Sequence, residues 1–501
     1  KAVSVGIVGG NTDCTVEVYS DVQDGSFNPQ NAKLETTKTV YLEYGGFNCI
    51  ELDKPVEVKK GSTFAVVVKV NNAYITLSEN EGESYVYRGG WTPSQAVRIK
   101  VFTKNDEKNQ NSIEFMDEGQ VKVRGNGGIK QLIITMSENE EGFQYPHIDT
   151  SKCVDCGLCQ CVCPTQMENI SVLFHVTPQT VSAAWNPNLS ERLESTSGGM
   201  FFLLACQFIN ERGVVYGADY REDLTVFHCR FDDSEALKRA RGSKYVQSDI
   251  NDTFLQVRTD LKNGRKVLFS GTPCQIAGLR LFLRKPYDNL FTIDLVCHGV
   301  PSPFFFKKNL TFLEKEYGDH VVDFKFRAKK KSGWRSYVKY VFNQRKPIWD
   351  FLGKNYYTHA FHLGYFNRAS CYTCDFSRSE RVGDITLSDF WGAEKHCRSL
   401  KKARKWGFNL VMCNTPQGRS LYETVLKYVE SMECPVEWAI QGDVRLRHTE
   451  QRPGMRDKAY KLLSEKGYAY MSSVYGIKES LPQRLIPAWA KNLIREIQSR
   501  I

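Results

Sequence analysis

This sequence of 501 residues has no long apolar run and no signal-like pattern at its start, and it has few cysteines in its first 150 residues. No uninterrupted run reaches the ~18 apolar residues of a transmembrane helix, so no membrane-spanning segment is expected. The start lacks the basic, apolar and small-residue pattern of a secretory signal, although a chain that opens at Lys1 can be a fragment with a signal upstream. Residues 1–150 hold only Cys14 and Cys49 of the 16 cysteines in the chain.

Charge divides at the same point. Residues 1–150 hold 15 Lys and Arg against 21 Asp and Glu, which leaves 52 of the chain's 67 against 36 of its 57 for residues 151–501. The net charge therefore changes from −6 to +16, which predicts two parts of different origin. Basic stretches such as "KFRAKKKSGWR" favour an acidic cofactor or redox partner, and no nucleic-acid partner is expected.

The first part is typical of an all-β sandwich over residues 1–104. Stretches such as "CTVEVYSD" and "STFAVVVKV" are short, β-branched and alternating, with turn residues between them. Residues 105–135 are acidic and then rich in glycine, and this composition predicts a linker.

A dense cysteine motif, "CVDCGLCQCVCPT", opens the second part. Cys153, Cys156, Cys159 and Cys163 follow the C-x2-C-x2-C-x3-C-P spacing that bacterial ferredoxins use for a [4Fe-4S] cluster, with Cys161 as an extra thiol. Zinc and a disulfide framework are the alternatives, but structural zinc draws two separate pairs and disulfides need an oxidising compartment. Residues 136–170 are therefore predicted to be a ferredoxin-type segment.

Residues 171–425 alternate apolar strands with helices, which predicts an α/β domain. Cys274 and Cys297 follow predicted strands at their carboxyl ends, where open sheets bind ligands. Together with Cys371 and Cys374, in loop contexts rich in Gly and Pro, they could hold a second [4Fe-4S] cluster or be ordinary buried cysteines. Residues 426–501 are expected to form a helical extension.

Several stretches of this part, among them "VLFSGTPCQIAGL", "DLVCHGVPSP", "RASCYTCDFS" and "RVGDITLSDFWG", occur in one order. Over residues 142–425 they resemble the coenzyme F420 hydrogenase/dehydrogenase beta-subunit family. The resemblance implies an iron–sulfur flavoprotein oxidoreductase that carries electrons between a hydride carrier, FAD and [4Fe-4S] clusters. Coenzyme F420, a deazaflavin, is the candidate carrier, the partner is a redox protein or a small molecule, and a link to polysaccharide biosynthesis is implied.

The resemblance also implies site residues. Cys274, Cys297, Cys371 and Cys374 become the ligands of the cluster nearest the flavin. Backbone N–H groups of "TSGG" at a helix start suit a pyrophosphate, although a plain helix start is the alternative. Asp384, Asp389 and Trp391 are expected to close the site, and His298 is a proton shuttle, a hydrogen-bond donor or structural. The predicted flavin contacts are Thr196, Ser197, Gly198, Gly199, Arg241, Gly242, Ser243, Lys244, Tyr245, Ser248, Thr272 and Gln275.

The first part carries its own resemblance. "GGFNCIELDKPVEVKKGSTFAVVVKV" and "GESYVYRGGWTPSQAVRIKVFT" resemble the lectin-like domain that accompanies papain-class cysteine peptidases. No papain-type nucleophile run is present, so the peptidase itself is missing. The resemblance implies an accessory module that binds carbohydrate, in which Tyr85, Tyr87 and Trp91 either stack on a sugar or pack a sandwich face.

Relatives in the redox family usually carry two ferredoxin motifs, each giving its fourth cysteine to the other's cluster. Here the place of the first motif is taken by "VKVRGNGGIK", which has no cysteine. The remaining motif could recruit a local fourth ligand, hold a [3Fe-4S] or water-ligated cluster, or stay empty, so one or two clusters are expected.

Two functions follow: the oxidoreductase, or a carbohydrate-binding adhesion module fused to an inactive redox domain. Because the cofactors supply the chemistry, no catalytic acid or base is expected. Thiolates favour a reducing cytoplasm.

Overall fold

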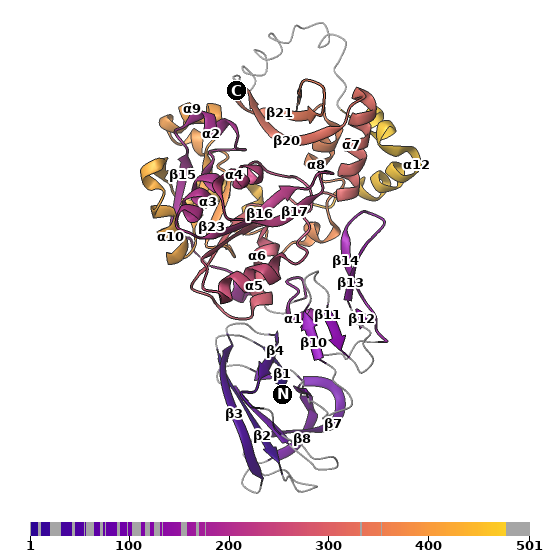
Figure 1. Ribbon diagram of the computed structural model, residues 1–501, viewed down its shortest axis with the longest axis vertical. Coiled ribbons are helices and arrows are strands. Elements are labelled where there is room, and N and C mark those ends of the chain that lie inside the picture. Colours follow the sequence, from indigo (N-terminus) through magenta and orange to yellow (C-terminus); the bar gives the residue numbers. More distant parts are fainter. Residues whose placement is uncertain are drawn as a thin grey trace. The chain divides into compact units, whose positions relative to one another are not determined.

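The chain divides into two compact units, one of 1–135, 146–174 and 277–287 and the other of 136–145, 175–276 and 288–501 (Figure 1). The computed structural model describes residues 177–330, 333–351 and 353–476 without interruption. Before these it describes residues 134–151, 158–166 and 170–175, and the strands between residues 2 and 132 with short flanks.

The first unit has a strand-rich N-terminal region whose strands pair antiparallel. One sheet has the order β4-β1-β6 with β9 also on β1, another has the order β3-β2-β5, and β7 pairs with β8. Alternate side chains of β2, Cys14, Val16 and Val18, are buried with Ile50, as a strand with one buried face requires. The strand-rich region is confirmed, and its closure into a sandwich stays a prediction. Its strands are β1 (Ala2–Val8), β2 (Thr12–Ser20), β3 (Lys33–Leu42), β4 (Gly46–Glu51), β5 (Ala65–Val70), β6 (Tyr74–Ile75), β7 (Leu77–Tyr87), β8 (Trp91–Val97) and β9 (Ile99–Phe102).

The predicted linker contains structure. β10 (Ser112–Phe115), β11 (Val121–Arg124) and β12 (Gln131–Leu132) form a three-stranded antiparallel sheet. The assignment of residues 105–135 as a linker stays a prediction, but it did not foresee these strands. Their alternation, in "SIEF" and "VKVR", is only four residues long, and the acidic and glycine-rich flanks conceal it.

The second unit contains an eight-stranded sheet in the order β17-β16-β18-β19-β23-β24-β15-β25. The four strands β16, β18, β19 and β23 are parallel, and antiparallel strands flank them on both sides. The predicted α/β architecture is thus confirmed for this unit. The strands are β15 (Thr180–Trp185), β16 (Val214–Tyr220), β17 (Val226–Phe231), β18 (Val267–Gly271), β19 (Leu290–Leu295), β23 (Ile385–Asp389), β24 (Asn409–Cys413) and β25 (Glu430–Glu433).

The sheet is buried on both faces. Val411 and Cys413 of β24 belong to a buried cluster that includes α3, whereas Leu410 and Met412 belong to a second cluster. Strands covered on both faces read as continuous apolar runs, which is why "NLVMC" and "VLFSG" show no alternation. The helices that flank the sheet strands in the chain are α2 (Leu189–Leu193), α3 (Met200–Asn210), α4 (Ser234–Leu237), α5 (Thr253–Lys262), α6 (Pro273–Leu283), α9 (Arg398–Ala403), α10 (Pro416–Glu423) and α11 (Val436–Gly442).

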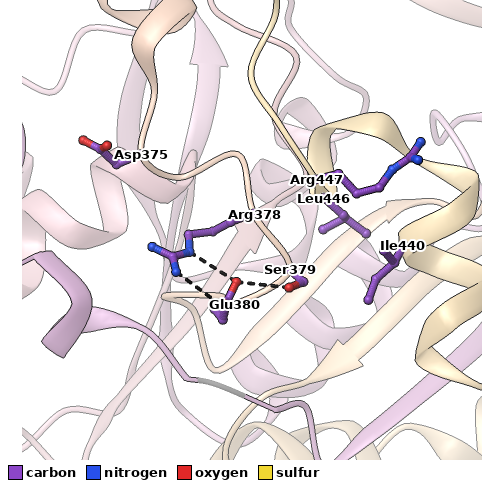
Figure 2. Close-up of a pocket in the computed structure, with 7 residues that line it drawn as sticks. All are labelled: Asp375, Arg378, Ser379, Glu380, Ile440, Leu446 and Arg447. Atoms are coloured by element: carbon purple, nitrogen blue, oxygen red, sulfur yellow. Dashed lines mark hydrogen bonds and ion pairs between the residues drawn. The ribbon is translucent and has the colours of Figure 1, made fainter.

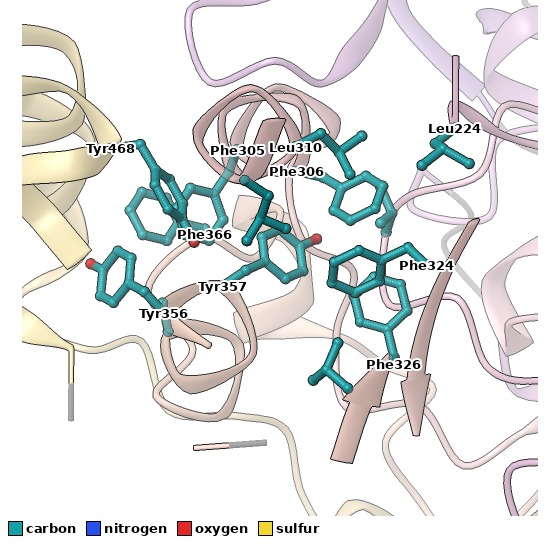
Figure 3. Close-up of a cluster of buried hydrophobic side chains, with 14 of the residues drawn as sticks. Leu224, Phe305, Phe306, Leu310, Phe324, Phe326, Tyr356, Tyr357, Phe366 and Tyr468 are labelled. Atoms are coloured by element: carbon teal, nitrogen blue, oxygen red, sulfur yellow. The ribbon is translucent and has the colours of Figure 1, made fainter. Parts of the chain in front are cut away.

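A smaller antiparallel sheet and three helices share an aromatic core (Figure 3). The ring of Phe305 lies 3.7 Å from that of Phe366 and 4.9 Å from that of Tyr357, centroid to centroid. The rings of Phe305 and Tyr357 thus join two helices that are separated in the sequence. The elements are β20 (Val321–Lys330), β21 (Gly333–Phe342), β22 (Ile348–Phe351), α7 (Pro303–Tyr317), α8 (Tyr356–His362) and α12 (Arg456–Tyr475).

Residues 136–145 are fastened to this core. The strands β13 (Ile134–Glu138) and β14 (Gln144–Ile148) pair with each other, and Glu141 lies between them. Both carboxylate oxygens of Glu141 accept hydrogen bonds of 2.6 Å from the buried guanidinium of Arg456. This bidentate pair fixes the turn between β13 and β14 to the start of α12.

The C-terminal extension is only partly helical. β25 pairs with β15 at the edge of the large sheet, while α11 and α12 are helices as expected. Residues 477–501 lie outside the described residues. None of the helices in the described part of the chain combines the length and hydrophobicity that crossing a bilayer requires.

Two buried carboxylates connect β19 with the start of β23. Asp294 of β19 accepts hydrogen bonds from the backbone N–H groups of Val382 and Gly383, at 3.2 and 3.0 Å. Asp384 accepts from the backbone N–H and the hydroxyl of Thr292, at 2.8 and 2.6 Å. Asp384 therefore holds two strands in register, and the expectation that it closes the ligand site is not supported by its position.

Replacing Asp384 with Ala should lower the free energy of unfolding by about 3 kcal/mol, because the Thr292 donors would stay buried without an acceptor. The change can be measured by chemical denaturation followed by near-ultraviolet circular dichroism. The control is Glu423→Ala, which removes an exposed ion pair with Arg419 on α10 and should cost less than about 0.5 kcal/mol. Equal stability of the two variants would contradict this role of Asp384.

Candidate functional site

The second unit gathers chemically capable side chains at one edge of its large sheet. β18, β19 and β23 are parallel neighbours, so their carboxyl ends lie at the same edge. Thr272 directly follows β18, Cys297 lies two residues after β19, and Asp389 is the last residue of β23. Open α/β sheets bind ligands at this edge.

The four predicted ligand cysteines of this unit come from three segments. Cys274 lies in the first turn of α6, which Pro273 opens, and Cys297 lies in the loop after β19. Cys371 lies inside a 3-10 helix (Ala369–Thr373), and Cys374 follows it directly. The expected loop context is therefore wrong for Cys274 and Cys371. For Cys274 the reason is Pro273, since proline at a first helical position favours a helix as well as a turn.

These four thiols share one electrostatic environment. Burial raises the pKa of Cys297, and the other three cysteines raise it further. Burial raises the pKa of Cys371 to about 12, again with contributions from Cys274 and Cys374. Arg368 lowers the pKa values of Cys274 and Cys371, but burial outweighs it, so the thiols stay protonated at neutral pH; a bound metal would favour the thiolates.

Packing between loops brings two of the segments together. Gly299 has φ +97°, and a Cβ there would lie 2.7 Å from the side-chain nitrogen of Asn367. The backbone N–H of Arg368 donates to the carbonyl of Val300 at 3.0 Å. Glycine is thus required where the Cys297 loop meets the Cys371 segment.

Within the described residues, no three Cys, His, Asp or Glu side chains converge closely enough to bind one metal ion. A cuboidal cluster spaces its thiolates more widely than a single ion, because each thiolate binds a different iron. The role of the four cysteines as cluster ligands stays a prediction.

His298 pairs with a residue that the sequence did not single out. Its Nε2 lies 3.4 Å from a carboxylate oxygen of Asp443, and the His298 side chain is 43% exposed. Burial alone would raise the pKa of Asp443, but His298 and Arg445 together lower it. Asp443 follows α11 in the region predicted only as an extension, so no motif pointed to it.

The ferredoxin-type segment is described in part. Cys153 and Cys156 lie outside the described residues. Cys159, in the short helix α1 (Leu158–Cys161), and Cys163 are half-buried. The Cys163 sulfur lies 3.2 Å from the Thr165 hydroxyl.

The "TSGG" turn opens α3 as predicted, with Gly199 at the N-cap and φ +88°. A Cβ on Gly198 would lie 2.5 Å from the carbonyl oxygen of Ala184. Asn409 already accepts a hydrogen bond of 3.2 Å from the N–H of Met200. Close packing therefore explains why residue 198 is a glycine. The N–H of Met200 already has a hydrogen-bond partner and is not available to a ligand.

The predicted flavin contacts of the "TSGG" turn and of the "RGS" stretch (residues 241–243) are hydrogen-bonded to each other. The hydroxyl oxygen of Thr196 accepts from the N–H of Ser243 at 2.7 Å, and Gly242 has φ +82°. Arg241 binds Glu191 at 2.5 Å and lies over the ring of Phe202, while its buried Nε has no partner. The "RGS" stretch thus contacts the "TSGG" turn, as flavin contacts must if they serve one ligand.

Lys244 is half-buried. Its Nζ donates to the carbonyl of Arg239 at 3.1 Å and lies 5.2 Å from the ring centroid of Tyr220. Burial lowers the pKa of Lys244 to about 8.

Ser248, Thr272 and Gln275 belong to a separate hydrogen-bond chain beside Cys274. The Gln275 amide donates to Ser248 at 2.9 Å and accepts from the N–H of Thr272 at 2.9 Å. The Thr272 hydroxyl lies 3.2 Å from the Cys274 sulfur, and Ser248 lies 2.9 Å from Nδ1 of His228. Burial lowers the pKa of His228 to about 4, so this histidine is neutral and orients the chain.

A buried ion pair that the sequence reading missed lies at the same edge. Arg327 of β20 contacts Asp389 at 2.8 Å and the Tyr245 hydroxyl at 3.1 Å. The indoles of Trp334 and Trp391 stack at 4.9 Å, with their centroids 5.2 and 5.7 Å from the Arg327 guanidinium carbon. Asp389 and Trp391, which were expected to close the site, are thus brought together, whereas Arg327 was read only as part of a basic run.

Lys329 adds a second buried cation from β20. Its Nζ donates to the carbonyl oxygens of Arg192 and Ser197, at 2.7 and 2.5 Å. Burial, then the charges of Arg192 and Arg327, lower the pKa of Lys329 to about 7. The "TSGG" turn is therefore supported by a lysine that can change charge near neutral pH.

A surface hollow is lined in part by Asp375, the residue that follows Cys374 (Figure 2). Arg378 and Ser379 both hold Glu380, through hydrogen bonds of 3.0 to 3.2 Å. The hydrogen bond from Arg378 lowers the pKa of Glu380 to about 2. The hollow is lined by Asp375, Arg378, Ser379, Glu380, Ile440, Leu446 and Arg447.

Three family models match separate stretches of the chain, each shorter than half of it. Residues 1–106 match a lectin-like domain, and residues 146–167 match a 4Fe-4S binding domain. Residues 264–434 match the C terminus of the coenzyme F420 hydrogenase/dehydrogenase beta subunit, a stretch that includes all four cysteines from Cys274 to Cys374.

Comparison with solved structures finds a chain of the F420-reducing [NiFe] hydrogenase complex from Methanosarcina barkeri. The two are 17% identical with a TM-score of 0.36, and the match covers 58% of this chain and 89% of that chain. No curated protein matches. The chain therefore carries, in order, regions similar to a lectin-like domain, a 4Fe-4S binding domain and the coenzyme F420 hydrogenase/dehydrogenase beta-subunit family.

Proposed function

We propose that the chain is an iron–sulfur flavoprotein oxidoreductase that moves electrons between a hydride carrier, FAD and [4Fe-4S] clusters. The observation that carries the proposal is the group of four mutually interacting thiols at a ligand-binding sheet edge. The matches to the 4Fe-4S and beta-subunit models support it. Coenzyme F420 or another hydride carrier is the electron donor or acceptor, and a link to polysaccharide biosynthesis rests on the resemblance alone.

The donor set suits a cluster held by Cys274, Cys297, Cys371 and Cys374. All four are free thiols, and the desolvation and mutual repulsion that raise the pKa values of Cys297 and Cys371 would be relieved by bound iron. The Thr272 hydroxyl beside Cys274 can donate to the sulfur, which favours its thiolate form.

The surroundings of the "TSGG" turn suit FAD. Arg241 and Arg327 have buried side-chain nitrogens without hydrogen-bond partners, and Lys329 donates to the carbonyl oxygen of Ser197 in the turn. An anionic pyrophosphate and a polar ring would satisfy such donors. The separate chain of Ser248, Thr272 and Gln275 lies beside Cys274.

The residues of the chain would bind, orient and exclude water, while the bound flavin would supply the exchange between hydride and single electrons. Trp334 and Trp391 lie against the Arg327 guanidinium, which helps to keep water from the ion pair of Arg327 and Asp389. Neutral His228 fixes Ser248, so the hydrogen-bond chain beside Cys274 holds one orientation. We place the protein in a reducing cytoplasm, because free thiols and clusters persist there.

A second candidate function is carbohydrate binding by the lectin-like region, fused to an inactive redox domain. The model match over residues 1–106 favours it. Tyr87 of β7 lies opposite Trp91 of β8 in the strand register, although both side chains lie outside the described residues. Glycan binding by a chain that retains neither iron nor flavin would favour this alternative.

Substituting two ligands should remove one cluster. The anaerobically purified variant Cys371→Ser/Cys374→Ser should contain about four fewer irons per chain than the unaltered protein. Iron and sulfide analysis with electron paramagnetic resonance of the reduced sample measures this loss. The control Cys397→Ser alters a free cysteine outside this group and should keep all iron; an unchanged iron content in the double variant would refute the assignment.

The ferredoxin-type motif can be tested in the same way. The unaltered chain should hold about eight irons if this motif recruits a local fourth ligand, and Cys153→Ser/Cys156→Ser should reduce the number to about four. Iron content that is insensitive to this substitution would show that the motif is empty.

FAD affinity should fall as pH rises. Free Lys329 has its pKa lowered to about 7 by burial, whereas a bound pyrophosphate would favour its charged form, so above this pH binding must take up a proton. The dissociation constant should rise by up to about tenfold per pH unit between about pH 7 and pH 9. Fluorescence titration measures it; Lys329→Met should flatten the profile, and the exposed Lys325→Gln should not. A flat profile in the unaltered protein would contradict this role.

A further inference from the structure

The ion pair of Arg327 and Asp389 is buried but incomplete. Both side chains are only 9% exposed. One terminal nitrogen of Arg327 serves Asp389 and Tyr245, while Nε and the other terminal nitrogen of Arg327 and Oδ1 of Asp389 have no hydrogen-bond partner. Buried polar atoms of this kind are costly unless a partner satisfies them.

The unpaired atoms have complementary roles. The Arg327 nitrogens are donors, and the Asp389 oxygen is an acceptor, so one ion pair presents both functions to a ligand. A phosphate or carboxylate offers acceptors only, and its charge would be repelled by Asp389. A ligand that satisfies both residues must carry a hydrogen-bond acceptor beside a donor, as a carbonyl oxygen beside an N–H group does.

The neighbouring side chains restrict the shape of that ligand. Trp334 and Trp391 are stacked with an angle of 16° between their planes, close to the guanidinium. Trp391 follows Asp389 by two residues, past the carboxyl end of β23. Indole rings beside a polar pair favour a planar, conjugated ligand with a hydrogen-bonding edge.

We propose that Arg327 and Asp389 bind the imide edge of a pyrimidinedione ring, with Arg327 donating to a ring carbonyl and Asp389 accepting from the ring N3–H. Isoalloxazine and 5-deazaflavin rings share this edge. The inference rests on the proposed function and assigns to it the residues that recognise the redox-active ring.

The test uses the full chain and three ligands: FAD, 5-deaza-FAD and N3-methyl-FAD, in which the imide donor is blocked. Calorimetric titration should give similar affinities for the first two and an affinity about tenfold or more lower for the third, because methylation leaves the Asp389 oxygen unpaired. Asp389→Ala should abolish this discrimination. Arg327→Lys should weaken all three ligands, since lysine lacks the planar fork.

The matched control is Lys325→Gln, two residues before Arg327 on β20, whose ion pair with Glu194 is exposed. It should keep the discrimination against N3-methyl-FAD. The comparison of ligands on the unaltered protein remains decisive if Asp389→Ala fails to fold, and Asp389→Asn, which keeps a neutral acceptor, should retain part of the discrimination.

Equal binding of FAD and N3-methyl-FAD, together with F420 binding that is indifferent to Asp389→Ala, would overturn the inference while leaving the flavoprotein function intact. Equal binding of the two FAD forms with F420 binding lost in Asp389→Ala would support it and assign the edge to the deazaflavin. A chain that binds neither ring would fail both this inference and the proposed function. Tight nicotinamide binding that depends on Asp389 would overturn the assignment to an imide ring.

Discussion

The candidate site depends on two carboxylates that water does not reach. Asp294 and Asp384 accept hydrogen bonds across β19 and the start of β23, and they fix how far these strands extend relative to each other. Cys297 follows the first strand and Asp389 ends the second, so this register sets the distance between the thiol group and the buried ion pair. Such ties are strong because an unpaired buried carboxylate is far more costly than a paired one.

Around this edge the protein favours the uncharged forms of several ionisable groups, whereas bound cofactors would favour their charged forms. Burial raises the pKa values of the cysteines and lowers that of Lys329. Iron would stabilise the thiolates, and an anionic ligand would stabilise the charged lysine. Cofactor binding is therefore coupled to the stability of the second unit, since any ligand that binds only the folded state stabilises it.

The sequence predicted the central parallel strands because such strands are continuous apolar runs, and it predicted that Cys274 and Cys297 follow them. It could not separate Asp384 from Asp389, five residues apart in one motif, because only the fold shows that one precedes β23 and the other ends it. Arg327 and Lys329 lay in a basic run that is usually solvent-exposed. Their burial arises from β20 packing against distant segments, which no local pattern encodes.

The stacked indoles of Trp334 and Trp391 have a spectroscopic consequence. Nearly parallel rings at 4.9 Å couple their electronic transitions, so this pair contributes a near-ultraviolet dichroism and fluorescence signature distinct from those of isolated tryptophans. Trp334 and Trp391 are 2 of the 8 tryptophans in the chain, so their signature is a substantial part of the total tryptophan signal. The pair adjoins the Arg327 guanidinium, so the protein carries an intrinsic optical reporter beside the residues that we propose to bind the ring.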